Sequence, residues 1–162
     1  MSELDLFYNY PMAVYLGADH RGFELKEKIK AHLSQNGYEV FDLGNDHLDP
    51  ADDYPDFGSK VGEAVGGDDQ AKGILVCGSG AGVLFTANKF KGVRATMALS
   101  ADQIYDARRD DDVNVLSISA NVQGEEEVLK IVQVFLGTTF SGEERHLRRI
   151  NKVKEIEERL YK

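Results

Sequence analysis

The chain has one cysteine, Cys77, which stands where the apolar run "GILVC" (residues 73–77) meets a glycine-rich turn. Glycines follow it at positions 78, 80 and 82, at the start of a helical pattern. Backbone N–H groups in such a turn can point inward as a nest that stabilises negative charge. This setting favours the thiolate form of a cysteine, so Cys77 is a candidate general base or nucleophile. The same N–H groups would form an oxyanion hole for an enolate-like oxygen.

A buried and chemically inert cysteine is the commoner meaning of a single thiol, and the residues alone leave both interpretations open. Three known loop types are excluded. A dinucleotide-binding fingerprint would need glycine where Val83 stands. A Walker loop would end in Gly-Lys-Ser/Thr, and a nucleophile elbow around Ser79 would need glycine in place of Cys77.

Two further pairs of residues could bind a substrate. Asp19 and His20 follow an apolar run, either as ligands or as a turn with a capping aspartate. Arg145 and Arg149 are four residues apart, so they share a helix face and could hold one phosphate, although a solvated pair is commoner. The histidines are too scattered to predict zinc binding; they stand at positions 20, 32, 47 and 146.

Apolar runs and helical periodicity alternate along the chain. Leu25, Ile29 and Leu33, for example, lie on one helical face that ends at Asn36-Gly37. Strands are predicted over 12–19, 38–44, 73–77, 93–99 and 113–119, and helices over 23–37, 57–67, 82–90, 101–111, 124–137 and from about 143. This alternation predicts an α/β fold, a three-layer α/β/α sandwich with a five-stranded, Rossmann-like parallel sheet.

The candidate residues stand near the ends of predicted strands. Asp19 and Cys77 end two strands, and a helix after a third strand runs into Asp110-Asp111-Asp112. Sites in parallel sheets lie at the carboxyl ends of the strands. We therefore expect these segments to converge on one edge of the sheet.

Composition limits the partners. The formal net charge is −9, whereas electrostatic attachment to nucleic acid needs a basic face. No apolar run approaches the roughly 20 residues of a membrane span. The N-terminus opens with acidic residues and shows no basic n-region or small-residue cleavage site, so we expect no secretory signal, and one cysteine gives no disulfide framework. We expect a cytoplasmic protein that binds neither nucleic acid nor membrane.

Five segments together resemble the ribose/galactose isomerase family, the group of ribose-5-phosphate isomerase B. They are "GADHRGFELKEKI", "DYPDF", "GILVCGSGAGVLFTANKFKGVRA", "NVL" and "RHLRRI". The resemblance runs from about residue 12 to about 158, and implies one isomerase domain over 12–162 behind an N-terminal extension at 1–11. It implies interconversion of an aldose phosphate and a ketose phosphate through an enediolate, without metal or other cofactor. It also implies a homodimer, or a tetramer of such dimers, with shared active sites and the helix from about 143 at the interface.

The resemblance assigns roles residue by residue. Cys77 matches the base that moves a proton between C1 and C2, and Ser79 matches a position implicated in ring opening. The loop N–H groups of Gly78, Gly80, Ala81 and Gly82 match the cradle of the enediolate oxygen. Asp19 matches a ligand of sugar hydroxyls. Phosphate ligands are matched by His20, Arg145 and Arg149, and positions near the site by Tyr54, Asn88 and Lys89.

The chain departs from the family pattern at three positions. Asp110-Asp111 replaces the usual His-Asn, in which the histidine serves ring opening and the asparagine donates to the enediolate oxygen. Asn121 stands where the family often has an arginine, lent across the dimer to the phosphate. These changes leave the proton-transfer centre whole but bear on ring opening, phosphate binding and the choice of sugar.

An ionised Asp111 cannot donate a hydrogen bond to an enediolate oxygen and would repel it. It must be protonated, paired with a cation such as Arg108 or Arg109, or turned away. We expect Asp111 to point away and Asp110 to take over ring opening, as a base or as a protonated acid. A divalent cation bound by Asp19, Asp110 and Asp111 is an alternative.

Two classes of function stay open. The first is an aldose–ketose isomerase of phosphorylated sugars, with ribose 5-phosphate as the first substrate to test and a hexose 6-phosphate or another sugar as the second. The other is a sugar-phosphate-binding paralogue with little activity. Cys77, Ser79 and the glycine loop favour the isomerase, since a protein that only binds needs no base.

Overall fold

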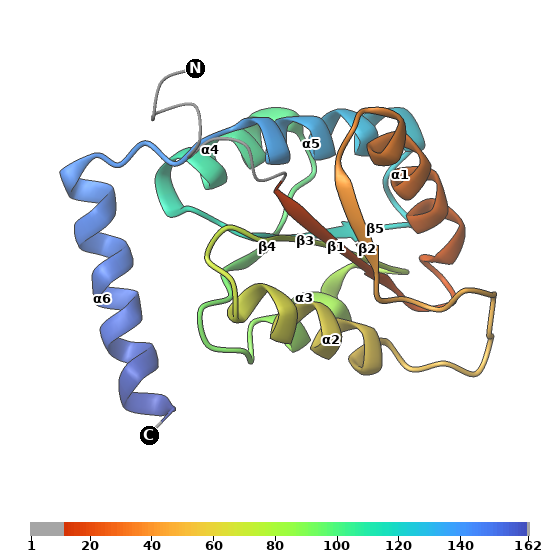
Figure 1. The fold of residues 1–162 in the computed structure, drawn as a ribbon, viewed down its shortest axis with the longest axis horizontal. Coiled ribbons are helices and arrows are strands. Elements are labelled where there is room, and N and C mark those ends of the chain that lie inside the picture. The colour runs from red at the N-terminus through yellow and green to blue at the C-terminus, as the bar shows by residue number, and fades with distance from the viewer. Residues whose placement is uncertain (1–11, 162) are drawn as a thin grey trace, which may run out of the picture.

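The computed structural model describes residues 12–161, so the extension expected at 1–11 lies outside the described residues. Strands and helices alternate in the predicted order (Figure 1). The strands are β1 (Ala13–Ala18), β2 (Glu39–Asp42), β3 (Lys72–Cys77), β4 (Ala95–Met97) and β5 (Val115–Ser119). The helices are α1 (Phe23–Gln35), α2 (Tyr54–Gly66), α3 (Ala81–Ala87), α4 (Ala101–Asp111), α5 (Glu125–Gly137) and α6 (Glu144–Leu160).

The five strands form one parallel sheet in the order β2-β1-β3-β5-β4, which confirms the predicted fold class. β3 lies at the centre, where Ile74 pairs in register with Leu16 of β1 and Leu116 of β5. Every residue of β3 and of β5 is buried. A strand covered on both faces needs apolar side chains on both, which explains the unbroken run "GILVC".

Helices cover both faces of the sheet. α1, α4 and α5 lie over one face, and α2 and α3 over the other (Figure 1). Ile29 and Leu33 carry the predicted apolar stripe of α1 into the first core, and Val61 and Val65 of α2 enter the second. The result is the expected three-layer sandwich.

Boundaries differ from the predictions by a few residues. α2 begins at Tyr54 instead of residue 57, because Pro55 fits the first turn of a helix, where its missing N–H costs no bond. β4 keeps only three of its seven predicted residues, since it is an edge strand paired with β5 alone. Gly37, with a φ of 81°, allows the left-handed turn that ends α1.

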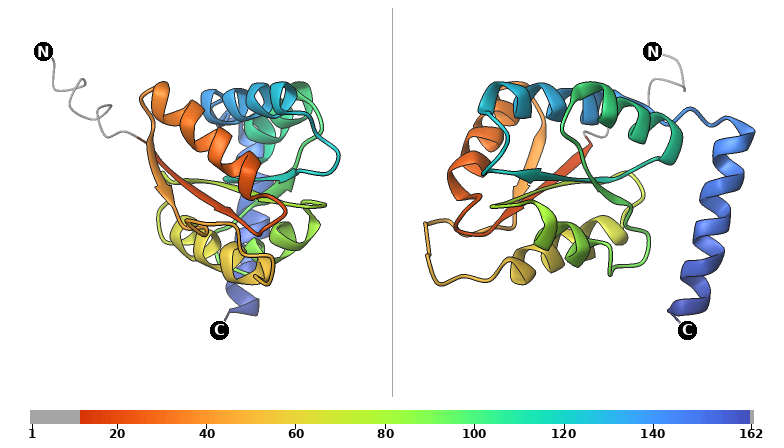
Figure 2. Two further views of the ribbon diagram at one scale, coloured as in Figure 1. Left: turned by 90° about the vertical axis from the view of Figure 1, so that its right-hand side faces the viewer. Right: turned by 180° about the vertical axis from the view of Figure 1, so that it is seen from behind.

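The last helix, α6, stands beside the sheet at its amino edge, the edge where the strands begin (Figures 1 and 2). Of its 17 residues only His146 and Ile150 are buried. Four large apolar side chains of α6 are exposed, among them Val153 at 54% and Leu160 at 75%; the others are Leu147 and Ile156. No helix within residues 12–161 is long and apolar enough to cross a membrane.

Candidate active site

The carboxyl ends of three neighbouring strands place the first group of candidate residues together. β1, β3 and β5 are adjacent in the sheet and end at Ala18, Cys77 and Ser119. The turns that follow these strands therefore meet at one edge, which we call the carboxyl edge. In the left view of Figure 2 this edge faces the viewer and α6 lies behind the sheet.

Cys77 lies under the glycine loop with only 4% of its surface exposed. The Gly80 N–H donates a hydrogen bond to its Sγ at 3.1 Å. Gly80 has a φ of 79°, and a Cβ there would lie 2.9 Å from the Met97 Cε. Only glycine fits this position without strain. The sulfur of Cys77 is thus held in place by a backbone donor of the loop that follows it.

Two serines of β5 fix the orientation of the loop. The Ser119 hydroxyl donates to the Gly78 carbonyl at 2.8 Å, and the Ser117 hydroxyl donates to the Gly80 carbonyl. In a trans peptide the N–H points opposite to the carbonyl. The next N–H groups in the chain, those of Ser79 and Ala81, therefore point away from β5. Our sequence analysis missed both serines, although hydroxyls inside the apolar run "VLSIS" were a usable signal.

Ser79 and Tyr54 flank the start of α3. Ser79 is exposed, and its Oγ accepts a hydrogen bond from the Ala81 N–H at 3.3 Å. The Tyr54 ring lies so close to Gly82 that a Cβ on that glycine would come within 2.9 Å of it. The Tyr54 ring also meets the Phe85 ring in an edge-to-face contact, with centroids 5.9 Å apart. Tyr54 thus forms one wall of the loop.

Asp19 shapes the turn after β1. Its side chain is buried, and Oδ1 accepts hydrogen bonds from the backbone N–H groups of Arg21 at 3.0 Å and Gly22 at 3.1 Å. This is the capping turn that the sequence left open as an alternative. The second oxygen, Oδ2, has no such bond within residues 12–161, and it leaves room for the predicted contact with a sugar hydroxyl.

His20 is held by a buried carboxylate. Asp52 Oδ1 lies 2.8 Å from His20 Nδ1 and also accepts from the His20 backbone N–H at 2.9 Å. This hydrogen bond is the largest cause of the raised pKa of His20, which the Asp19 charge raises further, while burial and the Arg21 charge oppose the shift. The bond on Nδ1 leaves Nε2 for a ligand, and the raised pKa favours the cationic form that a phosphate needs.

We expect NMR titration of His20 to give a midpoint above the ordinary value of about 6.5. Replacing Asp52 by Asn should lower that midpoint, because the amide carries no charge to stabilise the imidazolium. The cationic form, and the phosphate binding it supports, is present below the raised pKa and lost as the pH rises through it. A His20→Asn variant identifies the signal. A midpoint that Asp52→Asn leaves unmoved contradicts this account.

Asp110 and Asp111 lie at the opposite edge, so the prediction that all candidate segments converge on one edge is wrong. α4 starts after β4 and runs back along the sheet, and Asp112 pairs with Arg94 and Arg108 just before β5 begins. Asp110 Oδ1 accepts from Arg109 Nη1 at 2.9 Å and lies 3.6 Å from Nδ1 of the buried His146. The proposed cation site of Asp19 with Asp110 and Asp111 therefore cannot form within one chain.

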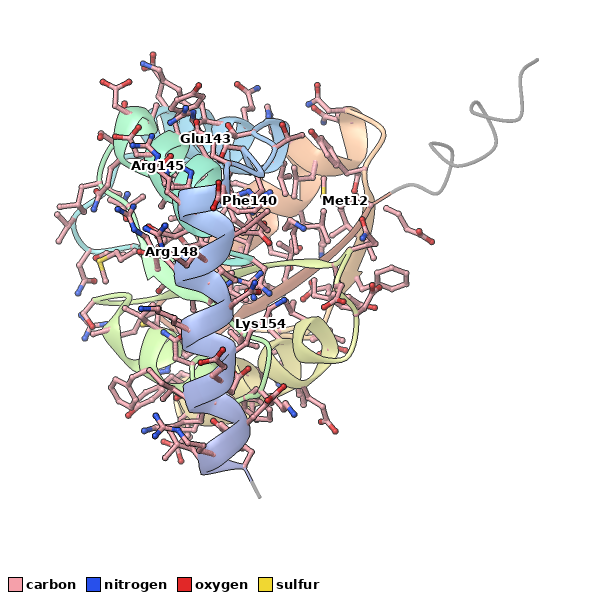
Figure 3. The ribbon with its side chains drawn as sticks, turned by 90° about the vertical axis from the view of Figure 1, so that its left-hand side faces the viewer. Met12, Phe140, Glu143, Arg145, Arg148 and Lys154 are labelled. Carbon is pink, nitrogen blue, oxygen red and sulfur yellow. The ribbon has the colours of Figure 1, made fainter. Side chains whose placement is uncertain are left out.

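Asp111 is exposed and lines an open cavity of about 280 Å³ between α6 and the start of β4. Arg149 and Arg94 line the same cavity. The pairing of Asp111 with Arg108 or Arg109 that we considered is not found, because those guanidiniums bind Asp112, Asp110 and Glu143. Arg145 is exposed and pairs with Glu143 at 2.9 Å; Figure 3 labels both at the start of α6.

Two remaining positions make contacts within their own chain. Asn88 is bound to the backbone of Ala95 through both its amide oxygen and its amide nitrogen, so it ties α3 to β4. Asn121 lies at the carboxyl edge, where its N–H donates to the Gly78 carbonyl at 3.0 Å. Position 121 therefore lies beside the glycine loop that follows Cys77 in its own chain.

Comparisons with known proteins show the family of the chain. Residues 14–153 match the family described as Ribose/Galactose Isomerase. The chain belongs to the ribose/galactose isomerase family. A probable ribose-5-phosphate isomerase B of Mycoplasma pneumoniae is 41% identical over 90% of this chain and 93% of its own length. The ribose-5-phosphate isomerase B of Escherichia coli is 39% identical over 90% of this chain and 97% of its own.

Solved structures of this isomerase family share the fold. The enzyme of Mycoplasma genitalium, crystallised with bound ribulose 5-phosphate, is 40% identical, covers 91% of this chain and 97% of its own, and has a TM-score of 0.87. The enzyme of Clostridium thermocellum is 39% identical, with coverages of 92% and 99% and the same TM-score. Membership in the family makes the chain an aldose–ketose isomerase by type.

Proposed function

We propose that the protein interconverts ribose 5-phosphate and ribulose 5-phosphate through an enediolate, with Cys77 as the base. The observation that carries this proposal is the Gly80 N–H aimed at the Cys77 sulfur inside a glycine loop. Removing a proton from a carbon next to a carbonyl needs a base and fixed donors for the oxygen that becomes charged. The thiolate and the loop N–H groups supply these two parts.

In this proposal the phosphate-binding arginines of α6 and the ring-opening Asp110 come from a second copy of the chain. Arg149 and Asp110 lie at the amino edge, across the sheet from Cys77 of the same chain. They can share a site with a thiolate only if the amino edge of one copy meets the carboxyl edge of another. The exposed apolar side chains of α6 fit burial in such an interface. A two-fold dimer would contain two equivalent sites.

The direct test is a coupled isomerase assay over a panel of pentose and hexose phosphates. We expect ribose 5-phosphate to give the highest kcat/KM. A preference for a hexose 6-phosphate would keep the mechanism and change the substrate. Tight binding of these sugars without turnover would instead identify a sugar-phosphate-binding protein.

Asp110 is proposed to catalyse ring opening. It is partly exposed, and the ion pair with Arg109 holds its carboxylate in place. We expect Asp110→Asn to slow turnover of ring-closed substrate by about 100-fold, within the range of general acid–base catalysis. Substrate supplied in the open-chain form should lose much less. Equal losses on both forms, or none on either, would show that another group opens the ring.

The matched control for Asp110→Asn is Asp106→Asn, which removes one exposed carboxylate from the same helix, α4. It should leave both rates unchanged. Activity of the parent protein should also survive exhaustive treatment with EDTA. A loss that a divalent cation restores would revive the cation alternative, in which aspartates of two copies hold the metal.

A further inference from the structure

Arg21, which the sequence analysis did not single out, lies across the mouth of the glycine loop. It follows β1, but its side chain lies over Gly78, which follows β3: a Cβ on Gly78 would come 2.8 Å from the Arg21 Nε. Its Nη2 donates to Asn121 Oδ1, after β5, at 3.3 Å. Arg21 thus connects the ends of the three adjacent strands β1, β3 and β5. Its guanidinium lies against Gly78, the residue that follows Cys77 in the chain.

The backbone of Arg21 is fixed. Its N–H donates to the buried Asp19 carboxylate, as does that of Gly22. Gly22 packs so closely on β3 that a Cβ there would lie 2.3 Å from the Val76 carbonyl oxygen. An arginine rooted in such a turn keeps its charge near the loop, although its side chain is exposed.

The charge of Arg21 is not neutralised by a neighbouring side chain. The other arginines between residues 12 and 142 are Arg94, Arg108 and Arg109, and each pairs with a carboxylate. Arg21 has no such partner among the described residues, and its one side-chain hydrogen bond there goes to a neutral amide. A guanidinium carries five N–H donors in a planar fork that fits phosphate oxygens, so most of its donors are open to a ligand.

We propose that Arg21 binds the substrate phosphate together with His20, at the carboxyl edge of the chain that supplies Cys77. This inference rests on the proposed function and adds a phosphate ligand to it. His20 and Arg21 are adjacent in the turn, Arg21 carries a positive charge, and the contact with Asp52 favours the cationic form of His20, so both can face one dianion. The enediolate oxygen has its own donors in the loop backbone, whereas the phosphate needs positive charge. Asn121 carries no charge, and the Arg21 guanidinium lies against its side chain. Arg21 therefore supplies the positive charge at this point of the carboxyl edge.

The test begins with Arg21→Ala. We expect the KM for ribose 5-phosphate to rise by about 10- to 100-fold, the cost of a lost charged hydrogen bond, while kcat changes little. The dissociation constant of inorganic phosphate, measured by calorimetry, should rise by a similar factor. Arg21→Lys should recover part of the loss. Lys130→Ala, which removes one exposed positive charge from α5, is the control and should change neither value.

A second variant moves the guanidinium instead of removing it. Because Arg21 reaches Asn121 at 3.3 Å, an arginine at position 121 can place its guanidinium in the same space. Adding Asn121→Arg to Arg21→Ala should therefore restore most of the affinity for phosphate. A purely structural role of Arg21 would not be rescued in this way.

Three results would overturn the assignment. The first is that Arg21→Ala changes neither the KM for ribose 5-phosphate nor the affinity for inorganic phosphate, while the parent protein is active. This result would refute the role of Arg21 without contradicting the proposed function. Another is a fall in kcat with unchanged phosphate affinity, which would place Arg21 at the enediolate. A third is an affinity that Asn121→Arg fails to restore. A parent protein that isomerises no sugar phosphate contradicts the proposed function, and Arg21 is then judged on inorganic phosphate alone.

Discussion

Cys77→Ala should lower kcat by about 100-fold or more, because it removes the base that we propose for proton transfer between C1 and C2. The loop donors and the phosphate ligands remain, so the KM should change much less. Cys77→Ser should be similarly impaired, since a hydroxyl is a far weaker base than a thiolate at neutral pH. Steady-state kinetics in both directions of the reaction measures the effect.

Two controls separate catalysis from folding. Cys77 belongs to the buried cluster between the sheet and α2–α3, so its loss also removes core volume. Val65→Ala removes volume from the same cluster at a distance from the loop and should lower the melting temperature while keeping kcat. Iodoacetamide should inactivate the parent protein, and substrate should slow that reaction. Near-normal turnover by Cys77→Ala would refute Cys77 as the base.

Much of the fold followed from the sequence for physical reasons. A strand that is buried on both faces, such as β3, needs apolar side chains on both faces, so its sequence is an unbroken apolar run. Such a run is easy to recognise. Helix faces such as Ile29 with Leu33 are equally plain. The loop around Cys77 was also predictable, because Gly80 adopts a positive φ that residues with a side chain rarely adopt.

The placement of Asp110 followed from the predicted fold, but our prediction put this residue at the wrong edge. α4 is 11 residues long, which at about 1.5 Å per residue carries the chain about 16 Å back along the sheet. Asp110 therefore lies at the amino edge, although the helix that carries it starts at the carboxyl end of β4. A helix that joins two parallel strands must return the chain to the edge where the strands begin, so residues at its end lie at the amino edge.

Arg21 and the two serines of β5 were missed for a different reason. Each contributes through a contact with another segment: Arg21 with Asn121, 100 positions away, and Ser119 with the Gly78 carbonyl, 41 positions away. Local sequence patterns do not show contacts between residues that are far apart in the chain. A turn residue such as Arg21 is ordinary in sequence, and only the adjacency of β1, β3 and β5 gives it a place beside the thiol.

The proposed sharing of each site between two chains leads to the second large effect, which is the recovery of activity from two impaired proteins. Arg145→Ala with Arg149→Ala removes the cations of α6, and each lost charged hydrogen bond should cost about 1.5–3 kcal/mol of phosphate binding. At low substrate concentration this double variant should be nearly inactive, as should Cys77→Ala. Neither variant can form a complete site in a dimer of identical chains, so neither should be active alone.

Mixing the two variants and exchanging their subunits should restore activity. In a mixed dimer one site combines the thiolate of one chain with the arginines of the other, and both of these are intact, while the second site lacks both. If half of the dimers are mixed, about a quarter of the wild-type activity should return, because each mixed dimer has one working site of two. Mixing Cys77→Ala with Cys77→Ser is the control and should restore nothing.

The outcome depends on an arrangement that the single chain cannot provide. Cys77 and Arg149 stand at opposite edges of one sheet, so a site confined to one chain could not use both. Failure of the mixture, with subunit exchange verified by mass spectrometry of tagged chains, would mean that α6 does not serve the thiolate of a partner. Phosphate would then have to be held at the carboxyl edge alone, by His20 and Arg21, and the α6 cations would serve no catalytic site.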